Sequence, residues 1–143
     1  MIANICMANP GINIGAQIGT RLPLWSATGK IFAAFKHDPE AHEWKRNQSK
    51  TLPVHKKKEL EIDQQTILED RFVYAAEPLV EHVSSFSVPI LNYKKDLIGA
   101  LTVVGFSTRI PQHPDDPISQ YVRQRCLEIS YAFGYQPSKE PSE

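Results

Sequence analysis

The chain has 143 residues, of which 41% are hydrophobic and 22% charged, and its 16 basic residues balance its 16 acidic ones. This length and composition predict one globular domain that is large enough to bury a core. The balanced charge argues against DNA binding by this chain alone, because phosphate contacts need an excess of Lys and Arg on one face. The two cysteines, Cys6 and Cys126, are too few for a disulfide framework and have no metal-ligand spacing.

The first residues have neither the basic leader nor the apolar core of a signal peptide. No apolar run in the sequence is long enough to span a bilayer. We therefore expect a cytoplasmic protein without membrane contact. We interpret residues 1–11 as a lead-in, and the alternation of apolar and polar side chains over residues 12–18 predicts a first strand.

Three helices are expected in the first half of the chain, at residues 30–36, 39–44 and 57–70. The first follows Ser26-Ala27-Thr28-Gly29, where Ser or Thr is placed to cap a helix. The second begins with Pro, which suits the first helical position. A fourth helix is expected after Asp116-Pro117 and should end at Gly134. Its expected buried stripe consists of Ile118, Val122, Cys126, Ile129 and Phe133.

Residues 71–75, 83–91 and 96–106 are rich in β-branched and apolar side chains, which predicts strands. The last two strands should form a hairpin across residues 92–95. In that pairing Leu91 faces Asp96, and Ser85 faces Thr102. Since the hairpin is antiparallel and helices surround it, the predicted class is α+β, with one antiparallel sheet and helices packed on it.

The predicted hairpin has two unlike faces because side chains alternate along a strand. One face carries large apolar side chains and suits packing under helices: Phe86, Val88, Ile90, Leu97, Leu101 and Val103. The other carries short side chains, with two valines at one end: Ser85, Ser87, Ala100, Thr102, Val83 and Val104. Short side chains at the centre of a sheet leave space. We interpret this second face as the floor of a small-molecule pocket.

The sequence IGTRLPL at residues 18–24, followed by SATGK at 26–30, resembles the signature of the effector-binding domain of IclR-type (isocitrate lyase regulator) bacterial transcriptional regulators. VSSFSVPI at 83–90 and IGALTVVG at 98–105 resemble the second recurrent block of that domain. The resemblance covers residues 12–135, which we take as the effector-binding domain. Residues 136–143 are expected to form a flexible tail.

The resemblance implies a GAF-like sheet, a small carboxylate or aromatic acid as effector, and assembly into dimers or tetramers. It also implies that DNA is bound only through a winged helix-turn-helix domain, which we expect to be absent because nothing before Pro10 is long enough to form it. Carried over from the family, the effector-binding positions are Ala27, Thr28, Ala75, Ser85, Thr102 and Val104. The predicted hairpin pairing independently places Ser85 and Thr102 on one face.

Structural explanations compete with binding at these positions. The Ser26–Gly29 turn can bind an anion through its free amides, or it can simply cap a helix. Ser85 and Thr102 can bond a ligand, or each other across the strands. The scattered histidines predict no metal site, and no cofactor is expected. Since no catalytic constellation is present, we expect no enzyme. Two alternatives stay open: a stand-alone GAF-like ligand-binding or oligomerisation module, and a small enzyme on that scaffold.

Overall fold

The computed structural model describes residues 2, 4–6, 19, 21–77 and 80–137. This part contains helices α1 (Ala27–Phe35), α2 (Pro39–Ser49), α3 (Val54–Asp70) and α4 (Pro117–Ala132), and strands β1 (Val73–Ala75), β2 (Val83–Leu91) and β3 (Leu97–Phe106). The strand predicted for residues 12–18 lies outside the described residues, as do all but two residues of the predicted tail. Within the described part, no helix is both long enough and apolar enough to cross a bilayer.

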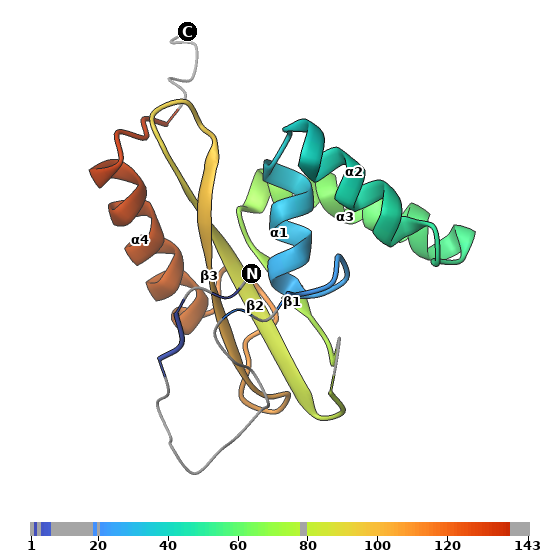
Figure 1. The fold of residues 1–143 in the computed structure, drawn as a ribbon. Coiled ribbons are helices and arrows are strands. Elements are labelled where there is room, and N and C mark those ends of the chain that lie inside the picture. The colour runs from blue at the N-terminus through green and yellow to red at the C-terminus, as the bar shows by residue number, and fades with distance from the viewer. Residues whose placement is uncertain (1, 3, 7–18, 20, 78–79, 138–143) are drawn as a thin grey trace, which may run out of the picture.

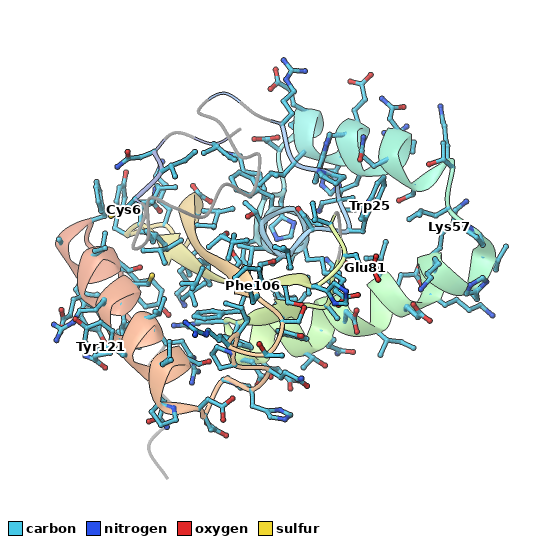
Figure 2. All side chains as sticks on the ribbon, turned by 90° about the horizontal axis from the view of Figure 1, so that it is seen from below. Cys6, Trp25, Lys57, Glu81, Phe106 and Tyr121 are labelled. Carbon is cyan, nitrogen blue, oxygen red and sulfur yellow. The ribbon has the colours of Figure 1, made fainter. Side chains whose placement is uncertain are left out.

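The sheet is antiparallel, with strand order β1-β2-β3, so β2 lies in the centre. Figure 1 shows α1 and the α2–α3 pair on one side of the sheet and α4 on the other. The same two layers are visible at right angles in Figure 2, where the strands separate α4 from the other three helices. The predicted α+β class is confirmed, with helices packed on both faces, whereas the GAF-like comparison stays a prediction.

The start of α1 follows from three neighbouring residues. The Ser26 hydroxyl accepts a hydrogen bond from the Gly29 amide at 3.0 Å and donates one to the Pro23 carbonyl at 2.7 Å. A side chain at Gly29 would lie 2.0 Å from that same carbonyl oxygen. Ser26 is therefore the cap, as one reading of the sequence predicted, and glycine is required because the helix packs directly on the preceding backbone.

Two hydrophobic clusters hold the layers together. The cluster between the sheet and α1 consists of Ala27, Ile31, Ala34, Ile67, Val73, Ala75, Leu91, Leu97 and Tyr135. The cluster toward α4 consists of Phe72, Phe86, Val88, Ile110 and Cys126. In the second cluster the rings of Phe72 and Phe86 stack with centroids 5.3 Å apart. Burial of these side chains provides the main driving force for the arrangement in Figure 1.

The hairpin register differs from the prediction by two residues. Ser87, and not Ser85, lies opposite Thr102, while Ser85 lies opposite Val104. The turn is longer than expected because the Asn92 side chain accepts hydrogen bonds from the amides of Lys94 (2.9 Å) and Asp96 (3.1 Å). A shift by two residues does not exchange the two faces, so the side chains from Val83 to Ile90 and from Gly99 to Phe106 keep their predicted faces.

A bulge near the turn changes the face of one predicted residue. Leu91 pairs with Leu97 while Ile90 pairs with Gly99, so β3 has one extra residue there. Leu97 consequently packs in the α1 cluster and not beside Phe86 as predicted. Leu101, also predicted to lie under helices, is 37% exposed because α4 packs against β2, the central strand.

Helix α4 buries only part of the predicted stripe. Cys126 is buried and Val122 packs beside it, but Ile129 and Phe133 are exposed, and Ser119 and Ser130 are buried in addition. Short side chains let the helix approach the sheet closely. The Ser130 hydroxyl accepts the amide N–H of Leu91 at 3.0 Å, so it pairs a backbone group at the bulge. Ile118, likewise predicted to be buried, is 55% exposed.

Candidate functional site

Three hydroxyl groups connect the first turn of α1 to the centre of the sheet. Thr28 Oγ1 lies 2.6 Å from Thr102 Oγ1, and Thr102 Oγ1 lies 2.9 Å from Ser87 Oγ. The contacts join α1, β3 and β2, whose residues lie far apart in the sequence. The sequence assigned Thr28 and Thr102 to the effector site and placed Ser87 on the same face of the sheet. It did not count Ser87 among the binding residues, and it predicted Ser85 at the position opposite Thr102 that Ser87 takes.

A second row crosses the three strands beside these hydroxyls. Ala75, Ser85 and Val104 lie opposite one another on β1, β2 and β3. Ser85 is 6% exposed, and its hydroxyl makes no hydrogen bond to a side chain or backbone group of the described residues. Ala75 is buried, and Val104 is 41% exposed. The row therefore presents one unbonded hydroxyl between two apolar side chains.

The sixth predicted residue, Ala27, can contribute only its backbone. Its side chain is buried in the α1 cluster with 1% exposure. As the first residues of α1, Ala27 and Thr28 have amides without intrahelical acceptors, and no other described residue accepts a bond from them. These N–H groups carry the positive end of the helix dipole, which favours an anionic group.

The structure thus brings the six predicted residues onto α1 and the strand face that it covers. The first turn of α1 rests on Thr102 at the centre of this face. Two clefts lie elsewhere on the described surface. One of about 190 Å³ lies between α1, α2 and α3, and one of about 670 Å³ lies between β2 and α4. None of the six residues lines either cleft.

The smaller cleft carries mixed charge. Lys30 forms an ion pair with Asp63 there, with Nζ and Oδ2 3.5 Å apart. Lys45 donates a hydrogen bond to the Lys36 carbonyl at 3.1 Å, and burial lowers the pKa of its ammonium group against an opposing effect of Asp38. No group of three His, Cys, Asp or Glu side chains among the described residues is placed to hold a metal ion.

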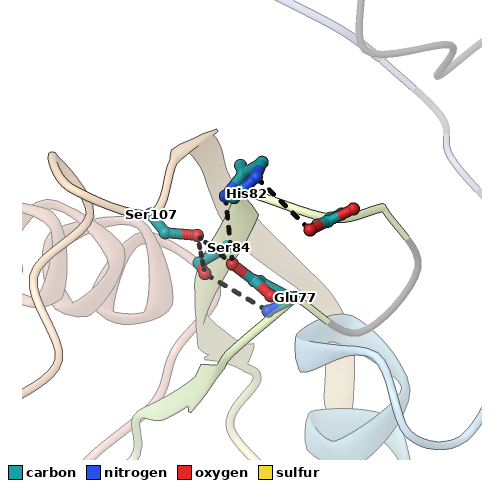
Figure 3. Close-up of polar contacts among 5 residues, drawn as sticks. Glu77, His82, Ser84 and Ser107 are labelled. Carbon is teal, nitrogen blue, oxygen red and sulfur yellow. Dashed lines mark hydrogen bonds and ion pairs between the residues drawn. The ribbon is translucent and has the colours of Figure 1, made fainter.

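A polar cluster that the sequence did not predict lies just beyond Ala75, at the end of β1 (Figure 3). The Glu77 amide donates to the Ser84 hydroxyl at 3.2 Å, and that hydroxyl lies 2.7 Å from the Ser107 hydroxyl. The Ser107 hydroxyl also donates to the Glu77 carboxylate at 3.3 Å. The imidazole of His82 lies 3.8 Å from this carboxylate. No local pattern joins Ser84 to Ser107, so only the folded hairpin reveals the cluster.

The cluster fixes two unusual backbone conformations. Glu77 has φ 45° and His82 has φ 63°, in the left-handed region that residues other than glycine seldom adopt. The Ser107 amide donates a hydrogen bond to the His82 carbonyl at 2.8 Å. The ends of the β1–β2 connection are therefore held in defined positions next to Ala75 and Ser85.

Comparison with known proteins decides the family. Residues 1–131 match the family model for the bacterial transcriptional regulator IclR C-terminal domain. The chain belongs to the IclR family. It corresponds to the effector-binding domain of these regulators, as the two sequence blocks predicted. No curated protein matches the sequence.

Solved structures show the same fold. Pseudomonas aeruginosa HmgR superposes with a TM-score of 0.82 at 22% identity, over 95% of this chain and 55% of that chain. Agobacterium tumefaciens repressor BlcR superposes with a TM-score of 0.69 at 18% identity, over 91% of this chain and 53% of that chain. A third structure is the inducer binding domain of Acinetobacter PobR, a double mutant in complex with 3-hydroxy benzoic acid. It superposes with a TM-score of 0.63 at 22% identity, over 85% of this chain and 73% of that chain. The IclR-family chain described here thus spans about half the length of HmgR and BlcR.

Proposed function

We propose that this domain senses a small organic acid, which binds where the first turn of α1 meets the sheet. The observation that carries the proposal is the contact of 2.6 Å between the Thr28 and Thr102 hydroxyls, at two positions that the family uses for its effector. The alternative to ligand binding is that the start of α1 only packs on the sheet. The amides of Ala27 and Thr28 favour binding, because no acceptor among the described residues pairs with them.

The chemistry of the surrounding residues suits a small carboxylate or an aromatic acid. The carboxylate would accept hydrogen bonds from the two amides at the start of α1. Ser85 offers a further hydroxyl, and its neighbours Ala75 and Val104 offer apolar contacts to a ring or a short chain. The 3-hydroxy benzoic acid bound to the PobR domain supports this class of ligand.

Binding there would act on a helix and not only on a loop. A carboxylate that bonds to Thr28 or Thr102 competes with the bond between them, so it changes the contact between α1 and the sheet. A ligand shifts a conformational equilibrium by its difference in affinity for the two states. In a regulator of this family the shift would reach DNA through a winged helix-turn-helix domain, by way of dimers or tetramers.

We further propose that the protein acts in the cytoplasm and has no enzymatic activity. The imidazole of His82 in Figure 3 lies beside two carboxylates, 3.8 Å from that of Glu77 and 3.4 Å from that of Glu81. Within the described residues, the Ser84 and Ser107 hydroxyls bond to each other and to Glu77, in contacts that hold the ends of the β1–β2 connection in place. The domain boundaries at residues 11/12 and 135/136 stay predictions.

Thermal unfolding with a panel of acids tests the proposal. The probes are benzoate, 3-hydroxybenzoate, pyruvate and succinate. A ligand at 100 times its Kd stabilises the folded state by about 2.7 kcal/mol, which corresponds to a rise in Tm of about 9 °C for a chain of this length. Thr102→Val and Ser85→Val should each reduce the rise. Thr66→Val is the matched control, because Thr66 is exposed on α3.

The outcomes separate binding from packing. Stabilisation that persists in both Thr102→Val and Ser85→Val would place the effector elsewhere. Absence of stabilisation by any acid in the panel would refute the proposed ligand class. Light scattering of the unliganded chain tests the proposed assembly: a strictly monomeric protein at micromolar concentration would contradict the expectation of dimers or tetramers.

A further inference from the structure

The larger cleft lies between β2 and α4, beside the stretch of β2 that β1 leaves unpaired. Its volume of about 670 Å³ falls within the range of small-molecule sites. The cleft exists because β1 is short. The first residue of β1, Val73, pairs with Ser87, so residues 88–91 of β2 have no β1 partner. Pro89 lies in this uncovered stretch, where its missing N–H leaves no donor unpaired.

The lining carries positive charge. Arg71 and Arg123 both line the cleft, and none of its lining residues is Asp or Glu. Arg123 is held by hydrogen bonds from its two terminal nitrogens to the carbonyls of Asp70 (2.9 Å) and Pro114 (3.4 Å). Neither arginine takes part in an ion pair between described residues. Since a guanidinium has five N–H donors, both arginines retain donors for an anion.

Tyr135 lines the same cleft and carries a buried hydroxyl. Tyr135 is 2% exposed, and its hydroxyl has no hydrogen-bond partner among the described residues. The Arg71 guanidinium lies 4.9 Å from the centre of the Tyr135 ring. Buried polar groups are nearly always paired in folded proteins, because an unpaired one loses its bond to water without compensation. An anion beside Arg71 would provide the missing acceptor.

The remaining walls are apolar or neutral. Val88, Pro89 and Leu127 provide hydrocarbon surface, while Gln120 and Gln124 on α4 provide neutral donors and acceptors. Tyr121, which Figure 2 labels on α4, is 62% exposed and also belongs to the lining. A bare inorganic ion would leave the hydrocarbon surface unused. The lining therefore favours an acid with an apolar body.

We propose that this cleft is a second binding site, for a small organic anion whose acidic group contacts Arg71, Arg123 and the Tyr135 hydroxyl. Its apolar body packs against Pro89 and Leu127. None of the residues that line this cleft is one of the six residues of the effector site proposed above, so the two sites are separate.

Isothermal titration of the full chain tests the site with benzoate, phenyl phosphate and inorganic phosphate as probes. Benzoate or phenyl phosphate should bind, and Arg71→Gln should weaken that binding about tenfold. Tyr135→Phe keeps the ring, removes only the hydroxyl and should weaken binding about fivefold. Arg125→Gln is the control, because Arg125 pairs with Glu128 outside the lining. Inorganic phosphate should bind at least tenfold more weakly than phenyl phosphate.

The results distinguish this cleft from the effector site. Binding that falls in Arg71→Gln and Tyr135→Phe but persists in Thr102→Val supports the second site. Binding that falls only in Thr102→Val overturns it and leaves the effector proposal intact. If Arg71→Gln does not fold, Tyr135→Phe decides alone. Absence of binding by all three probes at millimolar concentration also overturns the proposal, as does equal binding of phosphate and phenyl phosphate.

Discussion

Replacement of Gly29 by alanine should destabilise the domain strongly. The added methyl carbon would lie 2.0 Å from the Pro23 carbonyl oxygen and 2.9 Å from both Cα and the carbonyl oxygen of Leu24. All three are backbone atoms, so no side-chain rotation relieves the overlap. Helix α1 would have to move away from the preceding turn. That movement would separate the Gly29 amide from its cap, the Ser26 hydroxyl.

The size of the effect follows from these two losses. Overpacking of a close-packed region costs about 1–3 kcal/mol, and the loss of a helix cap costs about 0.5–2 kcal/mol. We therefore expect the free energy of unfolding of Gly29→Ala to fall by about 3 kcal/mol. With an unfolding entropy of about 2.1 cal/mol/K per residue, Tm should fall by about 10 °C.

Gly99→Ala is the matched control, since it makes the same chemical change in β3. A methyl group there would meet nothing within 4 Å, and the backbone does not have a positive φ. We expect Gly99→Ala to be neutral or to stabilise by up to about 1 kcal/mol. Urea unfolding of both variants measures the difference. A Gly29→Ala protein within about 0.5 kcal/mol of the wild type would refute the reasoning, because normal variation at an uncrowded site is of this size.

Three further substitutions test the contacts that join the layers. Thr102→Val should lower the free energy of unfolding by about 2 kcal/mol, because the hydroxyls of Thr28 and Ser87 lose their contact with Thr102. Thr66→Val should change it little, and urea unfolding measures both variants. Ser130→Ala removes the acceptor of a buried amide and should cost about 1–3 kcal/mol in the same assay; an unchanged midpoint would contradict this. Burial raises the pKa of the Cys126 thiol from 9.0 to about 11. Because the thiol has a higher pKa in the folded state than in the unfolded state, its effect on the free energy of unfolding is constant below pH 9. Between pH 9 and 11 the free energy of unfolding should fall by about 2–3 kcal/mol. Cys126→Ala should lack this loss when unfolding is measured at several pH values.

The sequence predicted those features that depend on local chemistry. Ser26 was recognisable as a cap, because serine there precedes an apolar helical pattern. The hairpin was recognisable from two β-rich runs around Asn92–Lys95. The second helix, predicted to end at residue 44, continues to Ser49, because residues 45–48 contain no helix breaker. Such errors at element ends are expected when only propensities are read.

Features that depend on tertiary contacts could not be predicted in this way. The register depends on how the Asn92 side chain folds the turn, and composition alone does not fix that geometry. The buried face of α4 follows from close approach at Ser119 and Ser130, whereas hydropathy favoured Ile129 and Phe133. Ser130 can be buried here because its hydroxyl accepts a hydrogen bond from the Leu91 amide of β2.

The hydroxyl contacts beneath α1 also explain why a covered site can still sense a ligand. A preformed open cavity would bind an acid without any change in the protein, and equal affinity for two states shifts no equilibrium. In the proposed site the Thr28–Thr102 contact would be exchanged for contacts to the ligand, which would couple binding to the position of α1. A neutral hydrogen bond contributes only about 1 kcal/mol. Two charge-assisted hydrogen bonds to an acid would therefore stabilise the bound state by more than the loss of the Thr28–Thr102 bond destabilises it. Replacement of a weak internal contact by a stronger external one is therefore a sufficient physical basis for the proposed sensor.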